Sequence, residues 1–390
     1  MPKANSNLLN LKKDYLFNEI EKKVLLKKKE NKKILNLGIG DISLPLASSI
    51  IDAMKLAIDE MRDKKTLKGY GPSDGYTFLK QKILDNDYKN LDIDIDEIFI
   101  SNGMKYSISN ISDLFSQNSK VGIINPAYPV YVDSNIMGGR KNQIVEIPLI
   151  EKNNFQPIIP NETLDLIYLC SPNNPTGLAY TKKILKSWVD YAIKNRSLII
   201  FDGAYEAFIR SENIVKSIYE IDGAKDVAIE MRSFSKNAGF TSLRCSYLIV
   251  PKNIKTHENV SINSLWKRYV DTKFGGISYP IQKAAEATYS QRAISEIKNT
   301  VDTYMKGAKF LYENLKNLNF ECFGGQNSPY IWCKCPDNLS SMKFFDLLLE
   351  KNIVTVPGIG FGRHGEGFVR FSAFASFETI NEAINKLKNI

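Results

Sequence analysis

Seven short apolar runs, separated by polar or amphipathic segments, constrain the fold more than any other feature of this sequence. They are rich in isoleucine and valine and barely alternate, and they occupy residues 98–100, 121–124, 144–147, 166–170, 198–201, 227–231 and 247–250. Runs of this kind are typical of strands that are covered on both faces. Amphipathic segments at 107–115 and 182–194 would be the helical crossovers. The pattern predicts an α/β fold with a mostly parallel seven-stranded sheet in three layers.

The pattern of predicted helices and strands changes after residue 255. A long helical pattern covers 281–318 with a break near Gln291, and short strand patterns at 320–323, 330–333, 354–356 and 368–371 flank a helical segment at 341–351. This arrangement predicts a smaller α+β domain that the N-terminal segment completes. We therefore expect a large domain over 46–260 and a small domain made of 1–45 and 261–390.

Composition indicates an ordinary globular enzyme. The chain has 390 residues, of which 43% are hydrophobic and 24% are charged, and such a length accommodates two domains. No apolar stretch approaches the roughly 18 residues of a membrane span, and the lysine-rich start has no signal-peptide core. These features predict a cytoplasmic protein that binds no membrane.

The net charge of +9 raises the alternative of a nucleic-acid-binding protein. Much of the excess lies near the N-terminus, where Leu16, Ile20, Val24 and Leu25 recur at helical spacing among lysines. This is the pattern of a solvated amphipathic helix, and no nucleic-acid-binding signature accompanies it. We expect no nucleic-acid partner.

The cysteines and histidines do not form a metal-binding pattern. Five cysteines are scattered along the chain, and the only histidines are His257 and His364. Without a second cysteine pair or a histidine cluster there is no zinc site to propose. We expect reduced structural thiols and no metal.

Polar residues follow most of the predicted strands. They comprise S-N-G-M-K at 101–105, N-P-A-Y-P at 125–129, S-P-N-N-P-T-G at 171–177, D-G-A-Y at 202–205 and Lys236. Taken singly, each is explained by a helix cap, a core aromatic residue or a turn. Because the carboxyl ends of parallel strands meet at one edge of a sheet, their combination predicts a functional site there.

The stretch at 233–244, S-F-S-K-N-A-G-F-T-S-L-R, indicates the chemistry of that site. Burial would lower the pKa of Lys236 and free its amine to condense with a carbonyl. Ser233, Ser235 and Arg244 would complement a phosphate dianion. An aldehyde and a phosphate occur together in pyridoxal 5′-phosphate (PLP). The alternative interpretation of these twelve residues is a basic loop with solvated serines.

The whole chain resembles the fold-type I PLP-dependent aminotransferases, and within them the LL-diaminopimelate aminotransferase family. The motifs that carry this resemblance are Y-L-F at 15–17, L-G-I-G-D at 37–41, G-Y-G-P at 69–72, Y-P-V-Y at 128–131, S-P-N-N-P-T-G at 171–177, A-Y-E-A-F at 204–208, 233–241 and P-Y-I-W at 329–332. The resemblance implies PLP as cofactor, an amino acid and a 2-oxo acid as substrates, lysine biosynthesis, and a homodimer with shared active sites.

The resemblance also implies roles for individual residues. Lys236 would hold the cofactor aldehyde and act as the catalytic acid and base, with Asp202 at the pyridine nitrogen and Tyr205 at the phenolic oxygen. Further cofactor contacts would come from Gly103, Met104, Lys105, Tyr128, Asn174, Ser233, Ser235, Arg244 and the partner's copy of Tyr70. Arg370 would take the substrate α-carboxylate. Other substrate contacts would come from Tyr15, Phe17, Ile39, Gly40, Ser73, Asp74, Lys105, Tyr128, Asn174 and Gly275.

Two of these positions depart from the family pattern. Ser73 stands where the family carries an acidic residue, and Gly275 stands where it carries asparagine; in the family both read the distal end of diaminopimelate. Asp74, next to Ser73, is a candidate to compensate. The alternative is an aminotransferase of the same family that acts on another amino acid. A PLP lyase or synthase and a non-catalytic regulator of the same fold are more distant alternatives.

Overall fold

The computed structural model describes residues 1–11, 16–30 and 33–388, with only the backbone of residues 16 and 17. Its larger sheet has seven strands in the order β2-β8-β7-β6-β5-β3-β4. These are β2 (Ile98–Ser101), β8 (Ser246–Ile249), β7 (Ala228–Ser233), β6 (Leu198–Asp202), β5 (Leu166–Cys170), β3 (Val121–Asn125) and β4 (Ile144–Pro148). The prediction of a mostly parallel seven-stranded sheet is confirmed, with β8 antiparallel to both of its neighbours.

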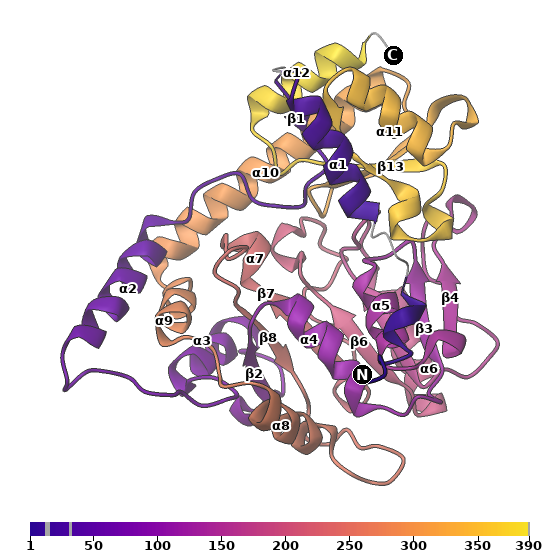
Figure 1. Ribbon diagram of the computed structural model, residues 1–390. Helices are drawn as coiled ribbons and strands as arrows, with labels where there is room; N and C mark the ends of the chain where they lie inside the picture. The colour runs from indigo at the N-terminus through magenta and orange to yellow at the C-terminus, as the bar shows by residue number, and fades with distance from the viewer. Residues whose placement is uncertain (12–15, 31–32, 389–390) are drawn as a thin grey trace.

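The helices around the larger sheet cover its faces, so the inner strands are buried along their whole length (Figure 1). They are α3 (Thr77–Asp87), α4 (Met104–Asn110), α5 (Val130–Met137), α6 (Lys182–Asn195), α7 (Phe234–Asn237), α8 (Ile262–Lys273) and α9 (Tyr279–Ala287). Helix α6 illustrates why these segments form helices that pack on the sheet. Its N-cap Thr181 accepts a hydrogen bond from the Ile184 backbone, and Leu185, Trp188 and Ala192 form one buried stripe.

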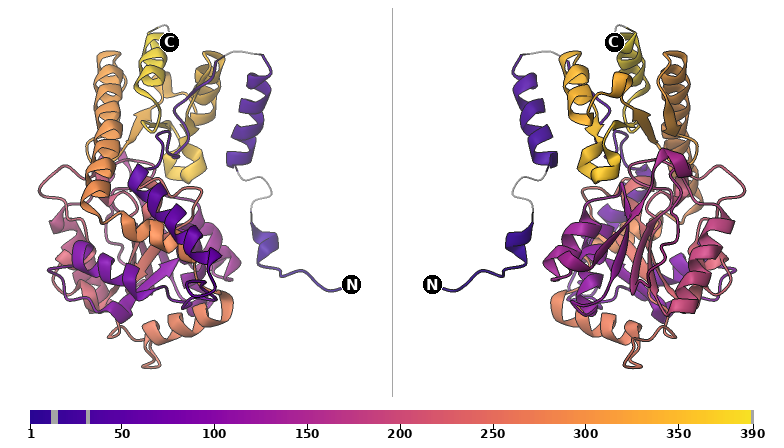
Figure 2. Two further views of the ribbon diagram at one scale, coloured as in Figure 1. Left: turned by 90° about the vertical axis from the view of Figure 1, so that its left-hand side faces the viewer. Right: turned by 90° about the vertical axis from the view of Figure 1, so that its right-hand side faces the viewer.

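A smaller sheet forms from the C-terminal third, in the order β12-β13-β10-β9. Its strands are β12 (Val356–Pro357), β13 (Phe368–Ser372), β10 (Tyr330–Lys334) and β9 (Cys322–Gly324). Helices α10 (Gln291–Asn317), α11 (Ser341–Glu350) and α12 (Phe377–Leu387) accompany it. Figure 2 shows these helices standing on one side of the larger sheet, and α10 runs between the two regions.

The N-terminal segment lies with this smaller sheet region. Strand β1 (Leu35–Asn36) pairs in parallel with β11 (Ile353–Val354), and α1 (Leu16–Lys28) is tied to α11 by a 2.7 Å ion pair between Lys23 and Asp346. Of the apolar residues expected on one face of α1, Ile20 and Val24 are buried. Leu25, in contrast, is 51% exposed. Helix α2 (Ser48–Asp59) packs on α9.

All five cysteines are free and buried. Among the described residues, no group of three or more His, Cys, Asp or Glu side chains could hold a metal ion. None of the described helices combines the length and apolar character that crossing a bilayer requires.

Candidate active site

A cavity of about 410 Å³ lies at the carboxyl ends of the strands of the larger sheet. Its lining contains most of the predicted site residues: Ile39, Gly40, Met104, Lys105, Tyr128, Asn174, Asp202, Tyr205, Ser233, Ser235, Lys236, Arg244 and Arg370. Strands β3, β5, β6 and β7 end at this edge, so their following loops converge there.

Lys236 lies on the short helix α7, directly after β7. Its Nζ donates a hydrogen bond to the Gly40 carbonyl, which belongs to the N-terminal segment. Burial lowers the pKa of Lys236 to about 8, aided by the nearby cations Arg370 and Arg244 and opposed by Asp41. About a fifth of the amine is therefore neutral near pH 7.4, far more than for an ordinary lysine.

Asp202 ends strand β6 and is buried. Its carboxylate accepts hydrogen bonds from the Tyr131 hydroxyl at 2.5 Å and from the Ala204 backbone N–H at 3.0 Å. Burial raises the pKa of Asp202 to about 6, although its contacts with Tyr131, Ala204 and Cys170 oppose the shift. A cationic N–H donor in the cavity would stabilise the ionised form of this carboxylate.

Arg370 reaches the cavity from strand β13 of the smaller sheet. Its Nη1 donates to Asn174 Oδ1 and its Nη2 donates to the Gly38 carbonyl, both at 2.6 Å. The guanidinium carbon lies 4.3 Å from the ring centre of Tyr330 and 5.0 Å from that of Phe361. Among the described residues, its buried Nε has no hydrogen-bond partner. The side chain is thus held in place with donor capacity left over.

Three cavity residues were missed by the sequence reasoning as functional groups. Tyr131 donates to Asp202, Tyr330 lies 2.9 Å from the Tyr205 hydroxyl and also faces Arg370, and Phe361 lines the wall beside Arg370. Tyr131 and Tyr330 belong to motifs that carry the family resemblance, and that was the available signal. Phe361 had none.

The remaining predicted residues lie elsewhere. Tyr70 is fully exposed. Ser73 and Gly275 line a separate cavity of about 420 Å³ that shares only Arg244 with the first. Asp74 lines neither cavity; its carboxylate accepts a 2.6 Å hydrogen bond from Lys80.

Two further predicted positions cannot be placed. Tyr15 lies outside the described residues, and the side chain of Phe17 is likewise undescribed.

Comparison with known proteins decides the family. Residues 32–387 match the family described as aminotransferase class I and II. The chain belongs to this aminotransferase family. It is 46% identical, over all of both chains, to the LL-diaminopimelate aminotransferase of Prochlorococcus marinus subsp. pastoris.

Solved structures agree with this membership. The L,L-diaminopimelate aminotransferase of Chlamydomonas reinhardtii is 37% identical and superimposes with a TM-score of 0.95, covering 100% of this chain and 98% of the other. An aspartate aminotransferase of Thermus thermophilus, a single mutant, has a TM-score of 0.87 at 17% identity over all of both chains, and so shares the fold. The predictions of the family, the fold-type I architecture and transaminase activity are confirmed.

This aminotransferase depends on PLP, as its family does, and the cavity fits that cofactor. Gly103 precedes α4 with a φ of +81°, and a Cβ there would lie 2.2 Å from Nη2 of Arg244. The guanidinium can therefore approach the start of α4 only because residue 103 is glycine. A partly neutral amine, a buried carboxylate and hydroxyls beside an arginine complete a donor set that matches an aldehyde, a pyridine nitrogen and a phosphate.

Proposed function

We propose that this aminotransferase moves an amino group from LL-diaminopimelate to a 2-oxo acid, in lysine biosynthesis. The observation that carries the proposal is the cavity that gathers Lys236, Asp202 and Arg370 on the scaffold of a full-length, 46% identical relative of that name. The lyase and regulator alternatives are not favoured, because the family and the full-length relatives are transaminases.

The residues of the cavity divide the work as follows. PLP, when bound, supplies an aldehyde for amines and a pyridine ring that accepts electrons. Lys236 would bind the aldehyde and, when free, would serve as the base that takes the proton from the substrate Cα and as the acid that returns it. Its pKa of about 8 suits both directions of transfer near neutral pH. Asp202 holds the proton of the pyridine nitrogen in place.

The other contacts orient the cofactor. Tyr205 and Asn174 would bind its phenolic oxygen, and Tyr128 would stack on its ring. Its phosphate would be held by hydroxyl, guanidinium and backbone N–H donors from Gly103, Met104, Lys105, Ser233, Ser235 and Arg244. Hydroxyls and a planar guanidinium match the phosphate oxygens in number and geometry.

Arg370 takes the substrate α-carboxylate. Its guanidinium is fixed by hydrogen bonds to Asn174 and Gly38 and lies against two aromatic rings, so little side-chain entropy is lost on binding. Its buried Nε retains a free donor within the described chain. Ile39 and Gly40 form the adjoining wall.

The assembly is a homodimer with shared active sites. Tyr70 is fully exposed, and Ser73 and Gly275 lie outside the active-site cavity of their own chain, which suits residues that serve the partner's site. Residues 46–260 form the large domain, and 1–45 with 261–390 form the small domain. The enzyme works in the cytoplasm.

The test is amino transfer with the purified enzyme. LL-diaminopimelate and a panel of 2-oxo acids are supplied, and the new amino acid formed from the oxo acid is quantified. A transaminase produces one new amino acid for each diaminopimelate consumed. Consumption without a new amino acid indicates a lyase, and turnover of other amino acids with none of diaminopimelate excludes the proposed substrate.

A further inference from the structure

A second cavity, of about 580 Å³, lies behind the segment that carries Lys236. Ser233 lines both cavities, whereas Phe234 and Asn237 line only the second and Ser235 and Lys236 only the first. Helix α7 therefore forms a wall between them. Aminotransfer as described above uses no residue that faces only this second cavity.

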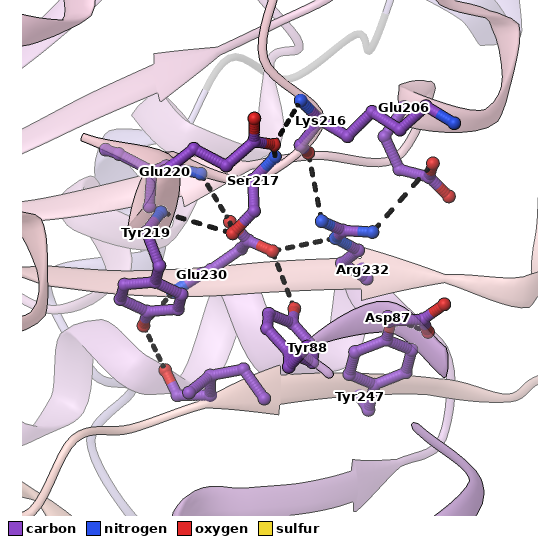
Figure 3. A network of polar contacts seen from close by, with 12 residues as sticks. Asp87, Tyr88, Glu206, Lys216, Ser217, Tyr219, Glu220, Glu230, Arg232 and Tyr247 are labelled. Carbon is purple, nitrogen blue, oxygen red and sulfur yellow. Dashed lines mark hydrogen bonds and ion pairs between the residues drawn. The ribbon is translucent and has the colours of Figure 1, made fainter. Parts of the chain in front are cut away.

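Two carboxylates, Glu206 and Asp87, line this cavity together with the guanidinium of Arg232, and Figure 3 shows Glu206 beside Arg232. Glu206 Oε2 lies 3.8 Å from Nη1 of Arg232, and Asp87 accepts hydrogen bonds from two tyrosine hydroxyls at 2.6 and 2.7 Å. Burial raises the pKa of Glu206, with Arg232 and Lys216 opposing the shift and Asp87 adding to it. Within the described chain, no hydrogen-bond donor reaches the Glu206 carboxylate.

The charge of Arg232 is already engaged elsewhere. Its Nε donates at 2.7 Å to Glu230, which is fully buried, and its Nη2 donates at 2.9 Å to the Lys216 carbonyl (Figure 3). The one charge of Arg232 is thus shared between Glu230 and Glu206, and Asp87 adds a further carboxylate to the lining of the cavity. The inner part of the cavity is therefore suited to an additional cation.

The rim has the opposite character. Lys298, Lys216 and Arg210 are exposed there, and Asp302 lies among them, 2.8 Å from Arg210. Between rim and floor, helix α10 contributes an aliphatic strip from Ile294, Ile297 and Val301. The cavity thus runs from a cationic rim with one carboxylate, along an apolar wall, to an anionic floor.

We propose that this cavity is a second binding site, distinct from the active site, for a free amino acid with a cationic side chain. The side-chain ammonium group lies at the floor between Glu206 and Asp87, and the aliphatic stem packs on α10. At the rim, Arg210 and Lys216 receive the α-carboxylate and Asp302 receives the α-ammonium group. Opposite charges at the two ends and an apolar middle match such a ligand in order and in chemistry.

The test uses L-lysine as the probe and the PLP-loaded enzyme, with binding measured by calorimetry. Glu206→Gln is expected to weaken binding at least about tenfold, since it removes a buried charge partner. The exposed Glu212 on the same loop provides the matched control: Glu212→Gln should bind as the wild type does. L-norleucine, which has the same stem without the ammonium group, should not bind.

An active-site origin of the signal is separated by Arg370→Ala, which impairs carboxylate binding there and should leave this binding intact. Hydrogen exchange of the wild type should show protection at 206–216 and 291–302 with L-lysine, a result that does not depend on any variant folding. The proposal is overturned if L-norleucine binds as well as L-lysine, or if L-lysine does not bind at millimolar concentration. It is also overturned if Arg370→Ala loses binding while Glu206→Gln keeps it. In hydrogen exchange, protection confined to 233–244 would overturn it as well.

Discussion

Asp202 and Glu230 are buried carboxylates on the adjacent strands β6 and β7, but they differ in how many hydrogen bonds the protein donates to them. Glu230 accepts four hydrogen bonds of 2.6–2.7 Å, from Tyr88, Arg232, Ser217 and the Ile218 backbone. Asp202 accepts two and faces a cavity. A carboxylate whose acceptor capacity is filled by the protein stabilises one arrangement of the chain. One that is left underfilled at a cavity edge is available to a ligand.

The largest effect should come from replacing Lys236, whose amine lines the same cavity as Asp202. Lys236→Ala removes both the attachment point and the proton carrier, so turnover should fall by at least about 10⁴-fold. The fold should persist, because the change removes an amine whose charge is disfavoured by burial. Borohydride reduction followed by mass spectrometry should find PLP on the wild type and none on the variant.

Lys183→Ala, at an exposed lysine of α6, is the control and should retain labelling and turnover. Cofactor mass that remains on Lys236→Ala would assign the attachment to another lysine.

On the other side of the comparison, Glu230→Gln should affect stability rather than chemistry. It leaves Arg232 buried with only the more distant Glu206 as a charge partner, which should cost about 3 kcal/mol in the free energy of unfolding. Urea denaturation measures this loss. The exposed Glu220, which accepts from two backbone N–H groups nearby, gives the matched variant Glu220→Gln with a cost of about 1 kcal/mol or less.

The folded fraction of Glu230→Gln should keep near-normal kcat. A loss of kcat larger than the loss of folded enzyme would show that the Glu230 cluster also acts on the active site.

The sequence predicted the strands, and through them the residues that follow strands. Short β-branched runs mark buried strands, and the convergence of their carboxyl ends predicts that Asn174, Asp202 and Lys236 lie together. The antiparallel direction of β8 was not predictable, because an apolar run of four residues carries no information about direction.

Residues whose roles depend on distant partners were harder to predict. Tyr330 meets Tyr205 across 125 residues of sequence, and Tyr88 meets Glu230 across 142. Locally each tyrosine looks like a core aromatic residue, and only tertiary packing supplies its hydroxyl with a partner. The Glu230 cluster therefore gave no signal in the sequence, although its residues are as buried as those of the active site.

A third prediction concerns pH and the enzyme freed of PLP. The pKa of Asp202 rises from 3.8 to about 6 on folding. Between these values the folded protein holds a proton that the unfolded chain has released, so raising the pH favours unfolding. Stability should fall by on the order of 2 kcal/mol from about pH 4 to pH 6 because of this group, and the loss should level off above about pH 7.

Asp202→Asn should lack this component, so the difference between the two proteins in urea midpoints across the pH range isolates it from other titrating groups. A difference that does not vary with pH would mean that Asp202 is not strained by burial, and the contrast with Glu230 would then lose its electrostatic basis.

A similar contrast between an engaged and an available carboxylate occurs near Ser73 and Gly275, the two positions that differ from the family pattern. Asp74 is engaged by Lys80, so it is not free to compensate for Ser73. The Ser73 hydroxyl instead donates a hydrogen bond to Asp271, an exposed carboxylate 198 residues away in sequence. In the proposed dimer, Asp271 can supply the negative charge that an acidic residue at position 73 would provide.

Asp271→Asn should therefore lower kcat/KM for LL-diaminopimelate about fivefold, the magnitude expected for one solvent-exposed charge pair. L-2-aminopimelate, which lacks the distal amino group, is the matched substrate and should be unaffected. Ser73→Glu with Gly275→Asn should gain little, because the new carboxylate would face Asp271, even though an asparagine Cβ at 275 meets no atom within 4 Å. If instead the double variant gains tenfold on diaminopimelate and Asp271→Asn changes nothing, the distal charge is missing from this chain and its natural substrate is a different amino acid.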